Sequence, residues 1–164
     1  MSDCIIKRFD ELTPTEVYAI SALRTDVFYL EQQCAEPEMD WRDLEPTTQH
    51  IFIMDAQSER RDSSGAPCEL AAYLRVITTI DDDAEEYPMT IGRVVVKLAR
   101  RGEGLAEKLM QTALGEHPGQ SIVLHAQTQA KGLYTKCGFV EVGDVFVEAG
   151  IEHITMVRKL NRDS

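Results

Sequence analysis

Apolar and polar positions alternate along the chain with two periods, one typical of strands and one typical of helices. Short apolar runs bounded by turn residues predict strands over 4–9, 50–54, 68–77, 90–98, 121–126, 139–147 and 153–160. Apolar residues at helical spacing predict helices over 14–30, 105–114 and 129–137. Residues 34–50 follow neither period, and we expect an irregular segment with one short helical turn there.

Local signals at the ends of these elements support the assignment. Thr13, Pro14 and Glu16 form a capping box with proline at the first helical position, which predicts where the first helix begins. Gly115 predicts the end of the second helix. The three valines at 94–96 are apolar without alternation, so we expect their strand to be buried on both faces.

The order of the predicted elements indicates the fold class. It is strand, helix, irregular segment, three strands, helix, strand, helix and two strands. Only the helices at 105–114 and 129–137 stand between strands in the way that a parallel crossover requires. We therefore predict an α/β (α+β) domain whose central sheet of about six or seven strands is mixed and partly antiparallel. The chain of 164 residues has the length of one such domain, and we predict a single domain over 1–164.

Composition and charge narrow the classes of function. The apolar fraction of 43% is too high for a disordered chain, and no apolar run approaches the ~18 residues of a membrane span. The formal net charge of −11 disfavours nucleic acid or a membrane surface as the main partner. The first residues resemble neither a signal peptide nor a transit sequence, so we expect a cytoplasmic protein. The cysteines lack the spacing of metal ligands, so we expect reduced thiols and no metal site.

The segment from Arg101 to Ala106 contains two glycines and lies between the strand at 90–98 and the start of a helix. Glycines let the backbone approach a ligand closely, and the free N–H groups of a helix start form an anion site. Residues 93–108 contain five basic and two acidic side chains, a local charge of +3 in an acidic chain. The pattern favours a loop that binds a phosphorylated cofactor. A tight turn with solvated arginines is the alternative.

Two motifs at this loop and at the next helix resemble those of the GCN5-related N-acetyltransferases (GNAT). The first, Q/R-x-x-G-x-G/A, is matched by Arg101, Gly104 and Ala106. The second, N-x-x-A-x-x-x-Y-x-x-x-G-F, is matched by Ala130, Tyr134, Gly138 and Phe139, with Gln127 in place of the usual Asn. The stretches 23–32, 125–127 and 150–154, the last of which contains His153, resemble the ElaA-type branch of that family. The resemblance covers residues 5 to about 160.

This resemblance implies the GNAT fold, in which a splayed pair of parallel strands holds acetyl-CoA. It implies an acyl-CoA-dependent N-acyltransferase that transfers acetyl to a primary amine, on a small molecule or a peptide, by direct attack and without a metal. It is compatible with a homodimer. The implied cofactor-binding residues are Val94, Val95, Val96, Arg101, Gly102, Glu103, Gly104, Leu105, Ala106, Gln127 and Tyr134.

The resemblance assigns Tyr134 to protonation of the departing thiolate, and the alternative is a core aromatic residue. Glu31 and His125 are the candidates on the base side, because an amine must be neutral to attack. A glutamate at a helix end is usually solvated and a lone strand histidine is usually structural, so both alternatives stay open. We expect Arg24 to be a structural ion-pair partner.

The acidic segments at 36–45 and 81–86 either attract a cationic acceptor or are solvated loops. Trp41 either covers the acceptor site or anchors its loop in the core. Two rival functions remain. One is a non-catalytic acyl-CoA-binding regulatory domain, and the other is an enzyme like the acyl-homoserine lactone synthases, which generally lack the two motifs found here.

Overall fold

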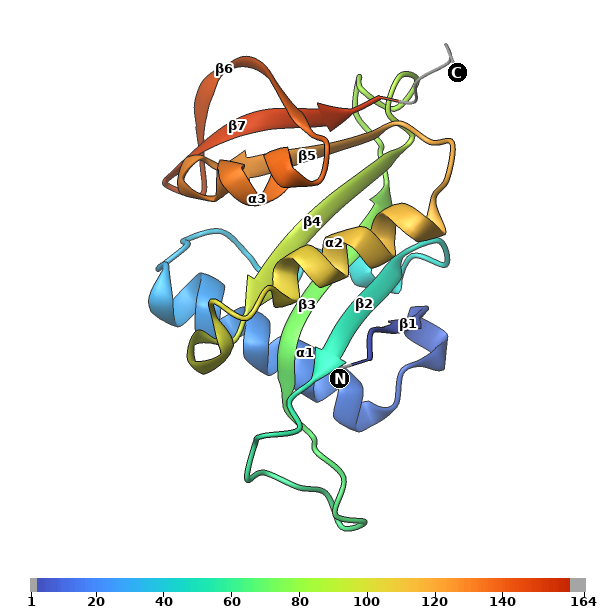
Figure 1. Ribbon diagram of the computed structural model, residues 1–164, viewed down its shortest axis with the longest axis vertical. Coiled ribbons are helices and arrows are strands. Elements are labelled where there is room, and N and C mark those ends of the chain that lie inside the picture. Colours follow the sequence, from blue (N-terminus) through green and yellow to red (C-terminus); the bar gives the residue numbers. More distant parts are fainter. Residues whose placement is uncertain (1–2, 160–164) are drawn as a thin grey trace.

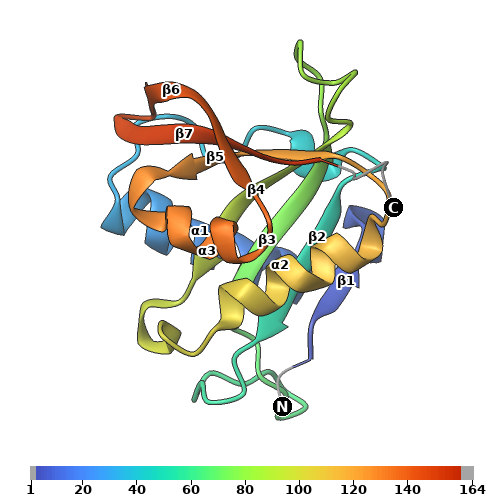
Figure 2. The same ribbon diagram turned by 45° about the horizontal axis from the view of Figure 1, so that its top comes forward.

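The computed structural model describes residues 3–159, and within them the strands form one seven-stranded sheet in the order β1-β2-β3-β4-β5-β7-β6 (Figures 1 and 2). Neighbouring strands are antiparallel except β4 and β5, which are parallel. The strands are β1 Ile5–Lys7, β2 Gln49–Met54, β3 Leu70–Thr78, β4 Met89–Val96, β5 Ile122–Gln127, β6 Val140–Glu148 and β7 Ile151–Arg158. The predicted mixed, partly antiparallel sheet is confirmed.

The helices also follow the predicted order. They are α1 Pro14–Arg24, α2 Leu105–Glu116 and α3 Lys131–Lys136, with short 3-10 turns at Phe9–Glu11, Arg42–Leu44, Leu98–Arg100 and Thr128–Ala130. The capping box of Thr13 and Glu16 starts α1 as predicted. The predicted stop at Gly115 is wrong, because Gly115 keeps a helical backbone and α2 ends one residue later, with His117 as its C-cap.

The first helix changes its winding after Arg24. Residues Thr25–Glu31 form a π-helix, and the N–H of Gln32 donates to the carbonyl of Val27, five residues earlier, at 2.9 Å. The predicted helix over 14–30 is therefore helical throughout but α-helical only in its first part. π-helical turns are frequent at functional sites, and this one contributes Phe28, Glu31 and the adjoining Gln32 to a cavity wall.

Helices α1 and α2 cover opposite faces of β2, β3 and β4 (Figure 1). Successive residues of a strand point to opposite faces. On β2, Phe52 accordingly packs in the cluster that contains α1, whereas Ile51 and Ile53 pack in the cluster that contains α2. Strands β5, β7 and β6 continue the sheet past β4, with α3 next to β5. No helix within residues 3–159 is long and apolar enough to cross a membrane.

Strands β2 and β3 are buried on both faces, whereas the strand that carries the three valines is not. Every β3 residue from Leu70 to Ile77 is buried, because both helices pack against the middle of the sheet. On β4 only Ile91 and Val95 are buried. The expectation that Val94–Val96 are buried on both faces is therefore wrong, because β4 borders a cavity on its β5 side.

Buried ion pairs fix the acidic segment at 36–45 against the sheet. Arg24 is 1% exposed and contacts Asp43 at 2.6 Å and Glu38 at 2.7 Å. Arg75 also contacts Asp43, at 3.1 Å. Burial opposes the charged form of Asp43, but both arginines outweigh it and hold its pKa below the usual range. The structural role expected for Arg24 is confirmed, and most acids of this segment are paired rather than solvated.

Candidate active site

Strands β4 and β5 are paired over only a short length. Their parallel register joins Met89 to Ile122 and Thr90 to Val123, and the strands diverge beyond these residues. A cavity of about 490 Å³ lies in the gap. Its two walls include Ile91, Gly92, Arg93, Val94, Val95 and Val96 from β4 and Leu124, His125 and Gln127 from β5. This geometry is the splayed parallel pair that the resemblance implied.

A bulge in β4 accompanies the divergence. Arg93 has a φ of +53°, and the pairing of β3 with β4 shifts register between Tyr73 and Arg75. A bulge bends its strand and increases the local twist, which turns the end of β4 away from β5. The Arg93 guanidinium then lies 2.9 Å from Glu38, so the same residue ties β4 to the acidic segment.

One end of the cavity adjoins the turn before α2. Gly102 and Gly104 have φ values of +86° and +77°, the left-handed conformation that favours glycine. Gly104 is the N-cap, and no side chain caps the helix. The first helical hydrogen bond runs from the N–H of Lys108 to the carbonyl of Gly104, at 3.1 Å, so the preceding N–H groups of α2 have no intrahelical partner. With Arg101 and Ala106 lining the cavity, this end suits an anionic group.

The basic side chains around this turn are paired within the protein. Lys97 contacts Asp55 at 2.7 Å, and Arg100, which is buried, contacts Asp55 and Glu103. The hydrogen bond that Arg100 donates to Glu103 is the main cause of the raised pKa of Arg100. Acids from distant parts of the chain thus balance the positive charge at 93–108. Backbone N–H groups, rather than unpaired positive side chains, are therefore what this turn offers to an anion.

Arg101 and Glu31 form a bidentate ion pair beside the turn that precedes α2. The two guanidinium nitrogens lie 2.9 and 2.8 Å from the two carboxylate oxygens. Both side chains line the cavity and are more than a third exposed, so the pair contributes little to stability. The candidate base Glu31 therefore lies at the α2 end of the cavity as the partner of Arg101.

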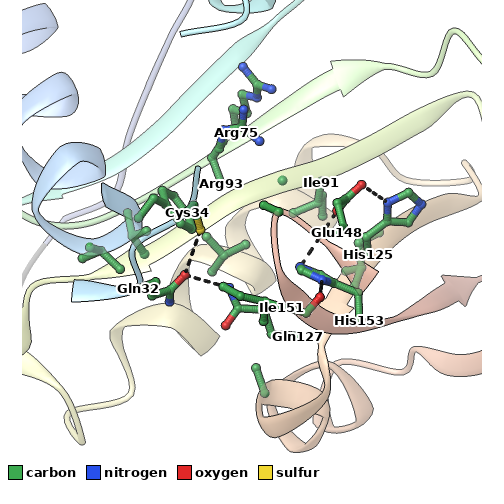
Figure 3. A pocket seen from close by; sticks show the side chains of 18 of the residues that line it. Gln32, Cys34, Arg75, Ile91, Arg93, His125, Gln127, Glu148, Ile151 and His153 are labelled. Carbon is green, nitrogen blue, oxygen red and sulfur yellow. Dashed lines mark hydrogen bonds and ion pairs between the residues drawn. The ribbon is translucent and has the colours of Figure 1, made fainter. Parts of the chain in front are cut away.

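Gln127 ends β5 where the family motif has asparagine. Its Nε2 donates to Oε1 of Gln32 at 2.9 Å, and its Oε1 accepts from Gln129 at 2.8 Å. Figure 3 shows the Gln127–Gln32 contact reaching from β5 to the residue that follows the π-helix. The substituted glutamine therefore joins β5 to the residue that follows the π-helix, and both residues line the cavity.

Tyr134 lies on α3 and lines the cavity with only 7% of its surface exposed. Its ring meets Phe139 edge-on, with 6.4 Å between the ring centroids. Burial, with a smaller effect from Cys137, raises the pKa of Tyr134 to about 12. The phenol is therefore protonated at neutral pH. Tyr134 is a core aromatic residue that also lines the cavity.

Three titratable side chains cluster in another part of the cavity (Figure 3). Nδ1 of His125 lies 3.4 Å from Oε1 of Glu148, and Nε2 of His153 lies 3.9 Å from Oε2 of the same carboxylate. The hydrogen bond with Glu148 raises the pKa of His125, and the same bond is the main cause of the lowered pKa of Glu148. The ring of Phe146 contacts both histidines.

Sequence reasoning selected His125 but neither Glu148 nor His153 for a role in catalysis. The available signal was the hairpin turn at Gly150, because a tight turn places the last residue of one strand close to the first residues of the next. In the structure His153 pairs with Phe146 across β6 and β7, and Glu148 ends β6. The position of β7 beside β5 then brings in His125.

Trp41 occupies neither of the expected positions. Its side chain is 79% exposed, which excludes a core anchor. The residues that line the cavity include Glu36, Pro37 and Glu38 from the same segment but not Trp41. The tryptophan adopts a left-handed backbone with a φ of +68° at the start of a 3-10 turn.

A family model described as an acetyltransferase (GNAT) domain matches residues 71–160, more than half of the chain. The chain belongs to the GNAT acetyltransferase family. This GNAT protein is 36% identical over 154 residues to the protein ElaA of Escherichia coli strain K12, with 92% of each chain covered. The crystal structure of E. coli ElaA matches it with a TM-score of 0.80 at 32% identity and covers 97% of this chain and 100% of that chain. An acyl-CoA N-acyltransferase from Pseudomonas aeruginosa matches with a TM-score of 0.78 at 34% identity, covering 96% and 99%.

These matches confirm the family, the ElaA-type branch and the fold that the motifs predicted. They also support the expected enzyme class, because the family is one of N-acetyltransferases. The cofactor-binding residues implied by the resemblance lie in one region of this GNAT protein. Those that line the cavity are Val94, Val95, Val96, Arg101, Ala106, Gln127 and Tyr134. The others, Gly102, Glu103, Gly104 and Leu105, form the adjoining turn and the start of α2.

Proposed function

We propose that this GNAT protein is an acyl-CoA N-acyltransferase that transfers acetyl from acetyl-CoA to a primary amine by direct attack. One observation carries the proposal: the cavity between the diverging strands β4 and β5 extends from an uncapped helix start to a buried, protonated tyrosine. An elongated substrate with an anionic part and a reactive thioester fits these two features. The family membership and the acyl-CoA N-acyltransferase from P. aeruginosa support the proposal.

The chain's backbone is suited to hold acetyl-CoA, which supplies an activated acyl group as its thioester. The N–H groups of the turn at 102–106 donate hydrogen bonds to the pyrophosphate. On β4, residues beyond Thr90 lack a partner on the β5 side, so Val94–Val96 have an edge free for the pantetheine amides. A β4 N–H aimed at the thioester carbonyl would lower the barrier by roughly 3 kcal/mol.

Two proton transfers are then needed. A lysine-like amine with a pKa of about 10.4 is neutral in roughly one molecule in 2,500 at pH 7, so a base must remove its proton. Glu31 and His125, the base-side candidates from the sequence, both line the cavity. Tyr134 donates its phenolic proton to the departing sulfur.

The proposal is tested by thermal unfolding of the wild-type chain with acetyl-CoA or NAD. Acetyl-CoA at 100 times its dissociation constant should add about 2.7 kcal/mol of stability. For a chain of this length that shift corresponds to roughly 5 to 10 °C in Tm. NAD should give a much smaller shift, and a larger shift with NAD than with acetyl-CoA would contradict the proposal.

A matched pair of variants tests the turn itself. Gly104 and Gly65 both have a positive φ, +77° and +86°, and a Cβ on either would meet no atom within 4 Å. Gly104→Ala and Gly65→Ala therefore impose a similar backbone strain, but only Gly104 adjoins the cavity, whereas Gly65 lies in the β2–β3 loop. We expect Gly104→Ala alone to reduce the Tm shift caused by acetyl-CoA. An equal shift in the two variants would show that the turn does not bind the cofactor.

A further inference from the structure

Two hydrogen-bond acceptors face each other across a short gap in the cavity. His153, on β7, is 7% exposed, and its Nδ1 lies 2.7 Å from the carbonyl oxygen of Ile151. A carbonyl oxygen only accepts, so Nδ1 carries the proton and Nε2 of the neutral ring has a free lone pair. That Nε2 is 3.9 Å from Oε2 of Glu148 (Figure 3).

The gap suits a donor with several N–H groups. At 3.9 Å, Nε2 and Oε2 are too far apart for a hydrogen bond. A primary ammonium has three N–H donors on one atom and can contact both acceptors at once. Both residues line the cavity, on the β5 side of the open β4 edge.

The neighbouring groups keep the carboxylate in place. Oε1 of Glu148 faces Nδ1 of His125 at 3.4 Å, and the His125 ring is held edge-on by Phe146, with 5.1 Å between centroids. Phe146 also stacks on His153, with 5.9 Å between centroids. The two carboxylate oxygens therefore have different neighbours: Oε1 faces His125, and Oε2 is directed toward His153.

We infer that Glu148 binds the ammonium group of the acceptor and that Nε2 of His153 is the base that removes its proton. This inference rests on the proposed function. His153 takes one proton and leaves a neutral amine, whose lone pair forms the C–N bond as the C–S bond breaks. The nitrogen then gives up a second proton to solvent, while the sulfur receives one from Tyr134, whose phenolate regains a proton from solvent. Each turnover therefore releases one net proton, which His153 returns to solvent.

The charges around the cavity favour a cationic acceptor without its own carboxylate near the amine. Glu36 and Glu38 line the cavity from the acidic segment, and Arg93, the cation on β4, already contacts Glu38. Glu148 completes the acidic side of the cavity. In this arrangement His125 is a positioning residue for Glu148, because its Nδ1 faces the carboxylate and its ring packs on Phe146.

The test compares His153→Asn with Glu148→Gln. Asparagine places an amide N–H near the Nδ1 position and keeps the hydrogen bond to Ile151, but it has no basic Nε2. Glutamine keeps the shape of Glu148 and removes its charge. The control is His117→Asn, because His117 ends α2 outside the cavity and contacts Gln49. Each variant is assayed with acetyl-CoA and benzylamine from pH 6 to pH 10.

We expect His153→Asn to lower kcat by ~10²- to 10⁴-fold, the usual contribution of a general base, and to shift the pH profile toward the pKa of the free amine. Glu148→Gln should raise KM for benzylamine by about tenfold or more and leave the affinity for acetyl-CoA unchanged. His117→Asn should match the wild type. A His153→Asn enzyme with wild-type kcat and pH profile would overturn the inference.

A second measurement does not depend on turnover. Ring nitrogen signals of His153 are followed by NMR in the wild type and in Glu148→Gln while benzylamine is added. The inference requires a shift of the His153 Nε2 signal in the wild type that is weakened in Glu148→Gln, and an unmoved signal overturns it. If the signal shifts but no acetyl is transferred to any amine, the proposed transfer fails and the ammonium site stands.

Discussion

Tyr134 is a buried residue that also lines the cavity. The ring packs on Phe139, and burial raises the pKa of its phenol to about 12, so the proton is present at every physiological pH. Tyr134→Phe keeps the packing and removes the proton. We expect a decrease in kcat of at least about tenfold, with acetyl-CoA affinity nearly unchanged. Single-turnover acetylation measures this, and a wild-type rate in the folded variant would make Tyr134 a packing residue only.

The position of Glu31 allows two roles, as the ion-pair partner of Arg101 or as the base, and a substitution distinguishes them. As the partner of Arg101 it competes with an incoming phosphate for the guanidinium. Glu31→Gln should then bind acetyl-CoA as tightly as the wild type or up to about fivefold more tightly, the scale of an exposed ion pair, with turnover preserved. Calorimetry and steady-state rates check this, with Glu141→Gln as an exposed control. A decrease in kcat of ~10²-fold or more would instead identify Glu31 as the base.

The site residues divide into those that a local motif indicates and those that only the folded chain brings together. Arg101, Gly104 and Tyr134 belong to contiguous motifs, so their shared position along one cavity could be predicted. The contact between Glu148 and His153 depends on the register of the β6–β7 hairpin and on which strand lies beside β7. The hairpin turn at Gly150 indicates that the two strands are adjacent, but no local pattern gives their register or the strand that lies beside β7.

At the scale of elements, buried arginines hold the acidic segment at 36–45, called the strap here, in place. Arg24 on α1 and Arg75 on β3 reach it from different elements and meet at Asp43. The strap contributes Glu36, Pro37 and Glu38 to the cavity wall. The stability of this ion network therefore determines the shape of the acceptor side.

Arg24→Met tests the strap. Removing one partner of a buried ion pair leaves the other charge uncompensated and costs about 3–5 kcal/mol. We expect a decrease of that size in the free energy of unfolding, measured by urea denaturation. The control is Lys131→Met, which removes an ion pair with Glu141 whose side chains are 40% and 47% exposed, and which should cost less than about 1 kcal/mol. Equal decreases in the free energy of unfolding of the two variants would show that the buried network stabilises the fold no more than an exposed ion pair does.

Elements with strong local signals could be predicted from the sequence. The capping box of α1 and the strands at 50–54 and 68–77, which are observed as the antiparallel pair β2 and β3, were predicted correctly. The expectation of two-sided burial for β4 was wrong, because a run of valines indicates a preference for burial but does not show that the strand borders a cavity. The π-helix after Arg24 has no composition signal, since its side chains suit an α-helix as well.

At the scale of the whole molecule, carboxylates in ion pairs make stability depend on pH. Hydrogen bonds from Ser58 and Lys97 lower the pKa of Glu69 from 4.5 to about 2, and arginine or lysine partners lower those of Asp40, Asp43 and Asp55 despite their burial. Such groups stabilise the fold above their unfolded pKa, and that stability is lost as pH falls through the folded pKa. We expect Tm to be nearly constant from pH 7 to about pH 5 and to fall from about pH 4.5 toward pH 2. A Tm unchanged at pH 3 would contradict these shifts.

The fold, the splayed strands and the family membership converge on one chemical claim, the transfer of an acetyl group from a thioester to an amine. The most direct measurement incubates the protein with acetyl-CoA and a panel of primary amines, and follows both free CoA thiol and acetylated amine by mass spectrometry. The account predicts equal amounts of the two products with at least one cationic amine, and neither product above background with Tyr134→Phe at short times. Tight binding of acetyl-CoA without any acetylated amine across the panel would contradict it and would favour a regulatory acyl-CoA-binding protein.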